Sequence, residues 1–491
     1  MILILSIGFS AYSFMLSSPF KTLDDQYSIV ANPLIHDSKH IKDIFTRGYF
    51  NDSSYYRPLV NVSFMAEYQV FGLNSFFYNL DNLLLHVLNA FLVWALVSVM
   101  TTNSTMGFLV GLLFVLHPIH AEAVANISGR AILLSACFSL STFIFFILYR
   151  QHNKGKFLWL SGIAFILGLL CKESTAVLPG VMVIYLWVKN KSMRGVWPFV
   201  VIVVLYVLLR QHLGITQTFP WRCVSEHILG FVTFLRSIIT DTGLLIFPLN
   251  LHYDRSQRLF LSFNDPEFLT TVFFWLIALI WLMMSYRRIK PMIWFCFVWV
   301  ALELLPVSQI ITTIGISPGI ISTADHFLYL ASVPFFIIVV DLMMAFWELN
   351  KLRQWISLRI LKMVAIGFFV FLFLINIEQN IYAGNELAMM ERSLQIQPEN
   401  ARLQSNVGLI YASKGQIENA QKHFMAAITG DPWNARYRIS FAKTVCDQGR
   451  YQECLDLYNQ ISNPGPFEKL LNENKQVTLR LIQQHAQLLS K

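Results

Sequence analysis

The 491-residue chain is 55% hydrophobic and only 13% charged, with a formal net charge of +8. Soluble domains carry about 25% charged residues, so this composition excludes an ordinary soluble protein and indicates a membrane protein with many spans. The basic residues lie mostly in short tracts between apolar runs, which argues against a nucleic-acid-binding patch and indicates cytoplasmic loops.

The first apolar run, from Met1 to Phe20, is long enough to cross a bilayer and leads directly to Lys21 and the acidic pair Asp24–Asp25. It has no basic start and no small-residue cleavage site, so we expect a retained helix and not a signal peptide. Carboxylates at the mouth of a first span lie where an acceptor from water can meet a lipid-borne donor. A pair of solvated loop charges is the plainer alternative.

Residues 21–80 are polar and aromatic, and we expect an outward loop with helices that lie on the membrane. We expect about eleven spans in total, with the amino terminus inside and the carboxy terminus outside. The run 227–247 contains Arg236 and Asp241 and is interpreted as re-entrant or interfacial. The later predicted spans lie at about 82–100, 106–118, 131–149, 157–171, 175–188, 195–213, 267–285, 291–309, 326–347 and 361–377.

Two kinds of loop alternate between these runs. Four basic tracts without acids should be cytoplasmic, and they lie at 150–156, 189–194, 287–290 and 351–362. The opposite loops carry ionisable residues at span ends, which is costly unless these residues pair or line a wet cavity. They are His117, His120, Glu122, Arg130, Lys172, Glu173, Asp325 and His326. Each alone is explained by a helix cap or an anchor; together with Asp24 and Asp25 on one side they favour a site.

From about residue 379 the composition becomes that of a soluble helical domain. A 34-residue repeat is readable, in which Pro398 recurs as Pro432 and Gly415 as Gly449, at the spacing of tetratricopeptide (TPR) repeats. We therefore expect a membrane domain at 1–378 and a TPR-like helical domain at 379–491 on the outer face.

The six cysteines are scattered and show neither a disulfide framework nor a metal-binding spacing. Cys446 and Cys454 lie eight residues apart in the TPR-like segment. We interpret them as packing residues in preference to a disulfide.

The motifs occur in one order: the acidic pair, Tyr56-Arg57-Pro58-Leu59, the histidine-rich stretch 117–124, Ser128-Gly129-Arg130, Lys172-Glu173 and a TPR array. In this combination the chain resembles the transmembrane-and-TPR O-mannosyltransferases and their bacterial relatives. These are similar to the protein O-mannosyltransferases, which have a glycosyltransferase-C fold.

The resemblance implies a polyprenyl-phosphate sugar donor handled on the outer or lumenal face, with inversion at the sugar carbon. It implies that Asp24 or Asp25 is the catalytic acidic residue and that the outer loops hold the lipid phosphate. Two departures from the family pattern are present. Ala131-Ile132 replaces the usual Lys-Asp after Ser-Gly-Arg, and Asp325-His326-Phe327 replaces an acid-Arg-Tyr sequence before Leu328.

The residue types fit this chemistry. A sugar on a lipid phosphate already has a good leaving group, so the reaction needs a carboxylate base for the acceptor hydroxyl and cations for the phosphate. The resemblance favours Asp24 over Asp25 as the base, because of its position in the family's acidic pair. The candidate donor-phosphate ligands are Arg57, Arg130, Lys172 and His326. The candidate supporting residues are His117, His120, Glu122, Glu173 and Asp325, with a core role for the two histidines left open.

No cofactor is demanded by the spacing, although the carboxylates are able to hold a divalent metal. We expect an integral glycosyltransferase of the bacterial inner membrane or the ER membrane. It would transfer a mannose-like sugar to an exported protein, with the acceptor recruited by the TPR domain and no nucleic-acid partner. Two alternatives stay open: a transferase that modifies a glycan or a lipid, and a non-catalytic membrane scaffold that presents the TPR array.

Overall fold

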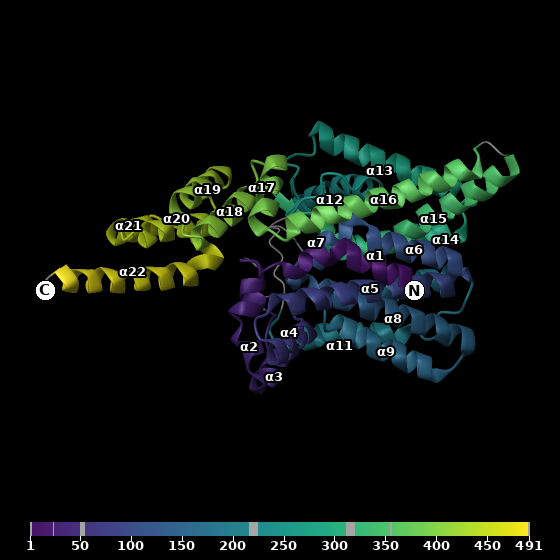
Figure 1. Ribbon diagram of the computed structural model, residues 1–491, viewed down its shortest axis with the longest axis horizontal. Coiled ribbons are helices and arrows are strands. Elements are labelled where there is room, and N and C mark those ends of the chain that lie inside the picture. The colour runs from purple at the N-terminus through teal and green to yellow at the C-terminus, as the bar shows by residue number, and fades with distance from the viewer. Residues whose placement is uncertain are drawn as a thin grey trace. The chain divides into compact units, whose positions relative to one another are not determined.

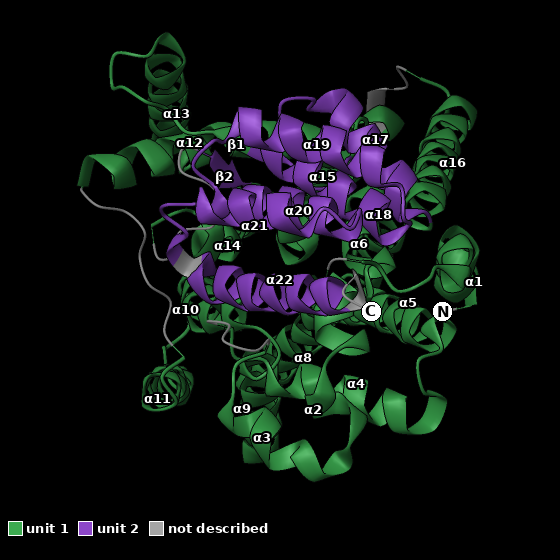
Figure 2. Ribbon diagram, turned by 90° about the vertical axis from the view of Figure 1, so that its left-hand side faces the viewer, with its two compact units in different colours: residues 1–251, 257–314, 323–384 green, residues 252–256, 315–322, 385–491 purple. Residues whose placement is uncertain are grey.

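This computed structural model describes residues 2–22, 24–49, 55–215, 224–310, 320–353 and 356–489, and these residues are almost entirely helical (Figure 1). Within these ranges the only strands are β1 (Ser256–Arg258) and β2 (Ile320–Ser322), which pair with each other. The predicted all-α class is confirmed. The chain divides into two compact units (Figure 2). Unit 1 comprises residues 1–251, 257–314 and 323–384, and unit 2 comprises residues 252–256, 315–322 and 385–491.

Every run that was predicted to span the membrane forms a helix in unit 1. These helices are α1 (Ile2–Tyr12) with the following turn η1 (Ser13–Ser17), α5 (Ser75–Thr101), α6 (Ser104–Leu116), α8 (Arg130–His152), α9 (Gly155–Leu169), α10 (Leu178–Val188), α11 (Trp197–His212), α13 (Pro266–Ser285), α14 (Pro291–Leu304), α15 (Leu328–Arg353) and α16 (Leu358–Ala383).

Six helices within the described residues are long and apolar enough to cross a membrane: α5, α8, α12 (Val224–Ile246), α13, α15 and α16. A seventh candidate is α6 together with its continuation to Ala125, which is bent by 53°. The polytopic membrane class is therefore confirmed. The number eleven requires the shorter apolar helices to cross as well, and it stays a prediction.

Helix α12 contains the segment that was interpreted as re-entrant or interfacial. By length and composition it is also able to cross a membrane. The visible part of α12 runs across the view in Figure 2, in which α11 is seen end-on. Arg236 on α12 donates to Glu267 Oε2 at 2.9 Å and to the carbonyl oxygen of Arg258 at 2.6 Å. This direction and this pairing favour the interfacial interpretation, which stays a prediction.

The predicted outward loop forms a small helical layer. It contains the π-helical turn η2 (Gln26–Val30), α2 (Pro33–His36), η3 (Ser38–His40), α3 (Ile41–Thr46) and α4 (Pro58–Phe71). Asn32 caps α2 by accepting from the Leu34 N–H at 3.1 Å. Ile35, Ile44 and Phe64 from these helices pack in one buried cluster with Ile127, at the start of the α8 region. The loop is therefore anchored on the segment that carries the Ser-Gly-Arg motif.

Unit 2 contains the predicted repeat as two helical hairpins. Its helices are α17 (Glu386–Ile396), α18 (Ala401–Ser413), α19 (Ile417–Gly430), α20 (Ala435–Asp447), α21 (Tyr451–Asn459), the turn η9 (Gly465–Phe467) and α22 (Glu468–Leu489). Asn400 and Asn434 cap α18 and α20, and both accept from the N–H of an arginine two residues on. Gly415 and Gly449 turn the chain between paired helices at φ of +73° and +78°, a conformation that L side chains rarely adopt.

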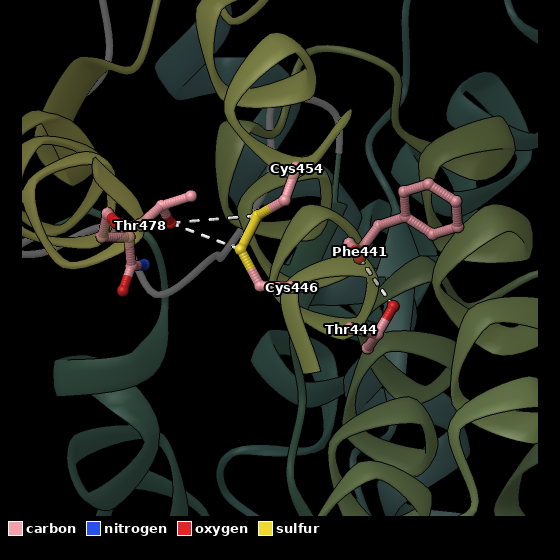
Figure 3. The surroundings of a disulfide bond; sticks show 6 residues. Phe441, Thr444, Cys446, Cys454 and Thr478 are labelled. Atoms are coloured by element: carbon pink, nitrogen blue, oxygen red, sulfur yellow. Dashed lines mark hydrogen bonds between the residues drawn. A yellow bond between two sulfur atoms is a disulfide. The ribbon is translucent and has the colours of Figure 1, made fainter. Parts of the chain in front are cut away.

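The prediction that Cys446 and Cys454 are packing residues is wrong, because they form a disulfide (Figure 3). Cys446 lies near the end of α20 and Cys454 near the start of α21, so the helical hairpin returns one to the other with 5.3 Å between their Cα atoms. Thr478 of α22 lies beside the bond, with its Oγ1 at 3.3 Å from Cys446 Sγ (Figure 3). The spacing of eight residues gave no sign of a bridge because it spans a turn between two helices.

Candidate functional site

The site is organised around residues 117–130, which we call the central loop. It contains the turn η4 (Pro118–His120), the short helix α7 (Ala121–Ala125) and the turn η5 (Ile127–Gly129). Gly129 is required at its end because a Cβ atom there would lie 2.0 Å from the carbonyl oxygen of Ala123. At the glycine of the Ser-Gly-Arg motif the backbone therefore passes close to the carbonyl group of Ala123. Helix α8 begins at the next residue, Arg130.

The two aspartates of the acidic pair have different surroundings. Asp25 is 1% exposed, and its two carboxylate oxygens accept from the backbone N–H groups of Lys21 at 2.9 Å and Ser128 at 3.1 Å. Burial is the main reason that the pKa of Asp25 is raised to about 6. Asp24 is exposed. Asp25 therefore ties the first loop to the central loop, whereas Asp24 lies at the surface of the protein.

Lys21 is a residue of this site that the sequence analysis passed over. Its Nζ donates to the carbonyl oxygen of Ala125 at 2.9 Å and to Asn126 Oδ1, and both acceptors lie in the central loop. It is also an electrostatic neighbour of Asp25 and Glu122. One indication of this role was present in the sequence, which is the position of Lys21 between the first predicted span and the acidic pair. In the sequence analysis Lys21 served only to mark the end of that span.

Arg57 lies at the start of α4 and makes a bidentate pair with Glu173. Its Nη2 donates to Glu173 Oε1 at 2.9 Å and its Nε to Oε2 at 3.3 Å. The guanidinium also lies over the ring of Tyr55, 4.5 Å from the centroid. The side chains of Arg57 and Glu173 are 15% and 23% exposed. The predicted phosphate ligand Arg57 and the predicted supporting residue Glu173 therefore form one partly exposed ion pair.

Lys172 adds a second cation beside this pair. It is half-buried and is an electrostatic neighbour of Arg57, Glu173 and Glu122. Burial is the main cause that lowers the pKa of Lys172 to about 8, and the positive charge of Arg57 acts in the same direction. A bound anion would oppose both effects, so Lys172 is suited to hold a phosphate.

Glu303 is a second residue that the sequence analysis missed. It is the only charged residue of the apolar run 291–309, which was the available signal. Glu303 Oε1 accepts from Trp299 Nε1 at 3.0 Å, and the carboxylate is an electrostatic neighbour of Lys172. It therefore places a carboxyl group of α14 in the neighbourhood of Lys172.

Glu122 and His326 are joined by two hydrogen bonds. His326 donates from its backbone N–H to Glu122 Oε2 at 3.0 Å, and its Nδ1 lies 2.9 Å from Glu122 Oε1. The two residues come from α7 and from the turn η8 (Asp325–Phe327), which precedes α15. Asp325, the other predicted supporting residue here, is buried at the start of that turn. A predicted cation and a predicted supporting carboxylate are thus brought together.

Arg130 has the surroundings of a structural residue. It is 0% exposed, and all three of its guanidinium nitrogens donate to protein groups. The acceptors are Asn82 Oδ1, Glu67 Oε1 at 2.8 Å, Asp81 Oδ2 at 3.4 Å and the carbonyl oxygen of Tyr78 at 2.9 Å. This geometry leaves no open side of the guanidinium for a phosphate, so we assign Arg130 to holding α4, α5 and α8 together.

His117 and His120 are core histidines. His117 Nδ1 accepts from the Ile119 N–H at 3.2 Å and caps η4. His120 lies between the carbonyl oxygen of Phe114, 2.8 Å from Nδ1, and Ser332 Oγ, 3.0 Å from Nε2. Both side chains are buried. Of the two interpretations left open by the sequence, this geometry favours the core role.

Electrostatic contacts connect the remaining residues into one region. The buried phenol of Tyr49 lies within range of Arg57, Asp24 and Asp25, and Lys172 lies within range of Arg57 and Glu122. Among the described residues no group of three His, Cys, Asp or Glu side chains is arranged to hold a metal ion. The arrangement places the exposed Asp24 and the cation Arg57 around the same two tyrosines, Tyr49 and Tyr55, which suits transfer from an anionic donor to a hydroxyl.

The sequence is similar to those of known proteins. A family model described as dolichyl-phosphate-mannose-protein mannosyltransferase matches residues 58–214. Protein O-mannosyl-transferase F38B6.6 of Caenorhabditis elegans is 24% identical over 88% of this chain and 63% of its own length. Protein O-mannosyl-transferase TMTC3 of Homo sapiens is 22% identical over 89% of this chain and 52% of its own length. This chain is related to the protein O-mannosyl-transferases.

The relationship confirms the family resemblance that the motifs predicted. A shorter match to Protein O-mannosyl-transferase TMTC2 of Homo sapiens is 33% identical but covers only 26% of this chain. The chain spans about half to two thirds of the length of the first relatives. The region 58–214 that the family model matches includes the central loop, Lys172 and Glu173 but not Asp24 or Asp25.

Proposed function

We propose that this chain is a membrane glycosyltransferase that transfers mannose from a polyprenyl-phosphate donor to a hydroxyl group of an exported protein. The observation that carries the proposal is the exposed carboxylate of Asp24 beside Asp25, which is buried and bonded to the central loop. The relatives are protein O-mannosyl-transferases, which supports the sugar and the acceptor class.

In this mechanism Asp24 is the general base. It takes the proton of the acceptor hydroxyl while the hydroxyl oxygen attacks the anomeric carbon from the side opposite the phosphate, which inverts that carbon. Asp25 does not touch the substrate; it holds the loop that carries Asp24, through its bonds to Lys21 and Ser128. The unequal exposure of the two carboxylates supports this division of roles.

The donor phosphate would be held by Arg57, Lys172 and His326. Arg57 and Lys172 are electrostatic neighbours, and both are partly exposed. Guanidinium and ammonium groups in a partly buried site stabilise a departing phosphate more strongly than the same groups in water. Glu173 and Glu122 fix the positions of Arg57 and His326 through the hydrogen bonds described above.

The reaction would take place on the periplasmic or lumenal side. The disulfide between Cys446 and Cys454 supports this side for unit 2, because disulfides persist in oxidising compartments and are rare in the cytosol. The four acid-free basic tracts support a cytoplasmic position for the opposite loops. We further propose that residues 379–491 form the TPR-like domain that recruits the acceptor, and that residues 1–378 form the transferase domain.

Mass spectrometry of exported proteins tests the proposal. Cells that lack the chain should lose O-linked hexose from a set of exported proteins. Re-expression of the wild-type chain should restore the hexose, whereas the chain with Asp24→Asn should not. The matched control is Asp43→Asn, a loop carboxylate that pairs with His40 at the protein surface. Equal restoration by the wild-type and Asp24→Asn chains would leave the scaffold alternative in the lead.

A further inference from the structure

A role of His326 as a phosphate ligand does not by itself explain the two hydrogen bonds that join it to Glu122. Glu122 accepts with both oxygens, one from the backbone and one from the ring of the same histidine. A carboxylate on Nδ1 keeps a proton on that nitrogen, because a carboxylate only accepts. The second nitrogen, Nε2, has no protein partner in the part of the chain that the structure describes, and the His326 side chain is 28% exposed.

The groups around this histidine leave Nε2 to an incoming molecule. The turn η8 packs against η4, α7 and α15. In η4 the imidazole of His120 is bonded to Phe114 and Ser332, and in α15 the Tyr329 hydroxyl is bonded to His86 and Asn89. The buried carboxylate of Asp325 lies on η8 itself, and Glu122 is the charged group of α7. Beyond these elements, Lys21 and Lys172 are electrostatic neighbours of Glu122.

We propose that His326 is the proton donor to the departing lipid phosphate and that Glu122 is its positioning residue. This proposal rests on the proposed glycosyltransferase function and adds a second proton transfer to it. Nε2–H of the imidazolium would donate to a non-bridging oxygen of the donor phosphate. The carboxylate of Glu122 stabilises the imidazolium and fixes the plane of its ring.

The proposed step conserves protons and electrons. The bond between the anomeric carbon and the phosphate oxygen breaks, and its electron pair stays on the phosphate. The acceptor oxygen forms the new bond to the same carbon, and its proton passes to Asp24. The proton on Nε2 passes to the phosphate, which therefore leaves with one negative charge and not two. Asp24 then releases its proton to water, and the imidazole of His326 takes one from water.

An imidazole is by its general chemistry a suitable acid for a phosphate leaving group. A phosphate monoester takes up its second proton at a pKa of about 6, and an unperturbed imidazole has a pKa of about 6.5. General acid catalysis works best when the acid titrates close to the working pH. A permanent cation such as arginine binds a phosphate but does not release a proton at neutral pH.

The test uses the purified full-length chain in lipid nanodiscs. Dolichyl-phosphate mannose is the donor, and microsomal proteins from cells that lack the chain are the acceptors. Mannose incorporation is measured between about pH 5.5 and about pH 9, on both sides of the imidazole titration. The variants are His326→Gln, His326→Arg and Glu122→Gln. The matched control is His40→Gln, because His40 Nδ1 pairs with Asp43 Oδ2 at 2.8 Å on the surface.

We expect the wild-type rate to fall as pH rises and the imidazolium is lost. His326→Gln should lower kcat by about 10²-fold and remove this fall. His326→Arg should keep the donor KM close to wild type but not restore kcat. Glu122→Gln should lower kcat and leave the donor KM close to wild type, because the ring loses the carboxylate that orients it. His40→Gln should behave as wild type.

Wild-type kcat in His326→Arg would overturn the proposal, since a fixed charge would then suffice. An alkaline limb of kcat that persists in His326→Gln would also overturn it, provided that kcat is measured at saturating donor, where the effect of Lys172 on donor affinity does not enter. If Glu122→Gln does not fold, the comparison of the two His326 variants still decides. Absence of any mannose transfer by the wild-type chain would instead overturn the proposed function, and the role of His326 with it.

Discussion

His326 and His120 lie on neighbouring turns, η8 and η4, but their imidazoles have opposite surroundings. His120 is 0% exposed, and both of its ring nitrogens are bonded to neutral groups of the bundle. His326 is partly exposed and is bonded to a carboxylate through one nitrogen. The same residue type is therefore a packing element in one region and a candidate for chemistry in the other.

Arg57 and Arg130, which lie at the beginnings of α4 and α8, differ in the same way. Arg130 is enclosed by four acceptors, whereas the Arg57 side chain is 15% exposed and pairs with the carboxylate of Glu173. A buried polar group needs all its hydrogen bonds within the protein, because unmade bonds there cost about 1–3 kcal/mol each. A group that binds a ligand must keep some of its hydrogen-bonding capacity for that ligand. We therefore infer the roles proposed for these two arginines from their exposure and their partners, and not from their residue type.

The sharpest way to break the comparison is to remove Arg130. Arg130→Ala should lower the free energy of unfolding by about 3–5 kcal/mol, because it leaves the Glu67 carboxylate buried without its partner. The loss should appear as a lower midpoint in thermal unfolding of the purified protein. Arg150→Ala, at the exposed end of the same helix, is the control and should change the midpoint little. A well-folded Arg130→Ala chain that binds the donor weakly would instead indicate that Arg130 is a ligand of the donor phosphate.

The acidic pair gives the next largest effect. Asp24→Asn should lower the rate of mannose transfer by about 10²-fold with an unchanged unfolding midpoint, as expected for the loss of a general base. Asp25→Asn should lower both the rate and the midpoint, because the amide replaces one of two acceptors for the Lys21 and Ser128 N–H groups. Transfer rate and thermal unfolding are measured on the same preparations. Identical behaviour of the two variants would remove the distinction between base and positioning residue.

The variant Arg57→Ala tests whether the partly exposed arginine binds the donor phosphate. Arg57→Ala should weaken use of the donor by about tenfold to a hundredfold, because one charge-assisted contact is worth about 1.5–3 kcal/mol. The effect should appear in the donor KM or in direct binding of dolichyl-phosphate mannose. Arg47→Ala is the control, since Arg47 is an exposed arginine of the same loop. A donor KM that does not change in Arg57→Ala would exclude Arg57 as a phosphate ligand.

The smallest predicted effect concerns pH. Burial lowers the pKa of Lys172 to about 8, so its ammonium group is charged below that pH and increasingly neutral above it. Donor affinity should therefore fall by up to about tenfold for each pH unit above 8. Lys172→Arg should remove this fall, because the guanidinium keeps its proton throughout the range. Binding of dolichyl-phosphate mannose across the pH series measures the effect, and an unchanged slope in Lys172→Arg would assign the fall to another group.

The sequence alone determined the class of protein and the order of its elements. Apolar runs long enough for a bilayer predict helices, because only helices or closed barrels satisfy the backbone in lipid. The repeat from Pro398 to Pro432 predicted the helical hairpins of unit 2 for a similar reason, since its small residues and turn glycines allow few other arrangements. The family resemblance rested on motifs whose residues are close in sequence, and it was confirmed by known relatives.

Only the tertiary structure distinguished residues that look alike in sequence. Neither the burial of Asp25 nor the exposure of Asp24 is readable from two adjacent acids, because the difference depends on where Ser128 lies. The enclosure of Arg130 depends on Glu67 and Asn82, and the Cys446–Cys454 bond depends on the turn between two helices. Local patterns fix backbone conformation, whereas the partners of an ionisable group are set by contacts between distant parts of the chain.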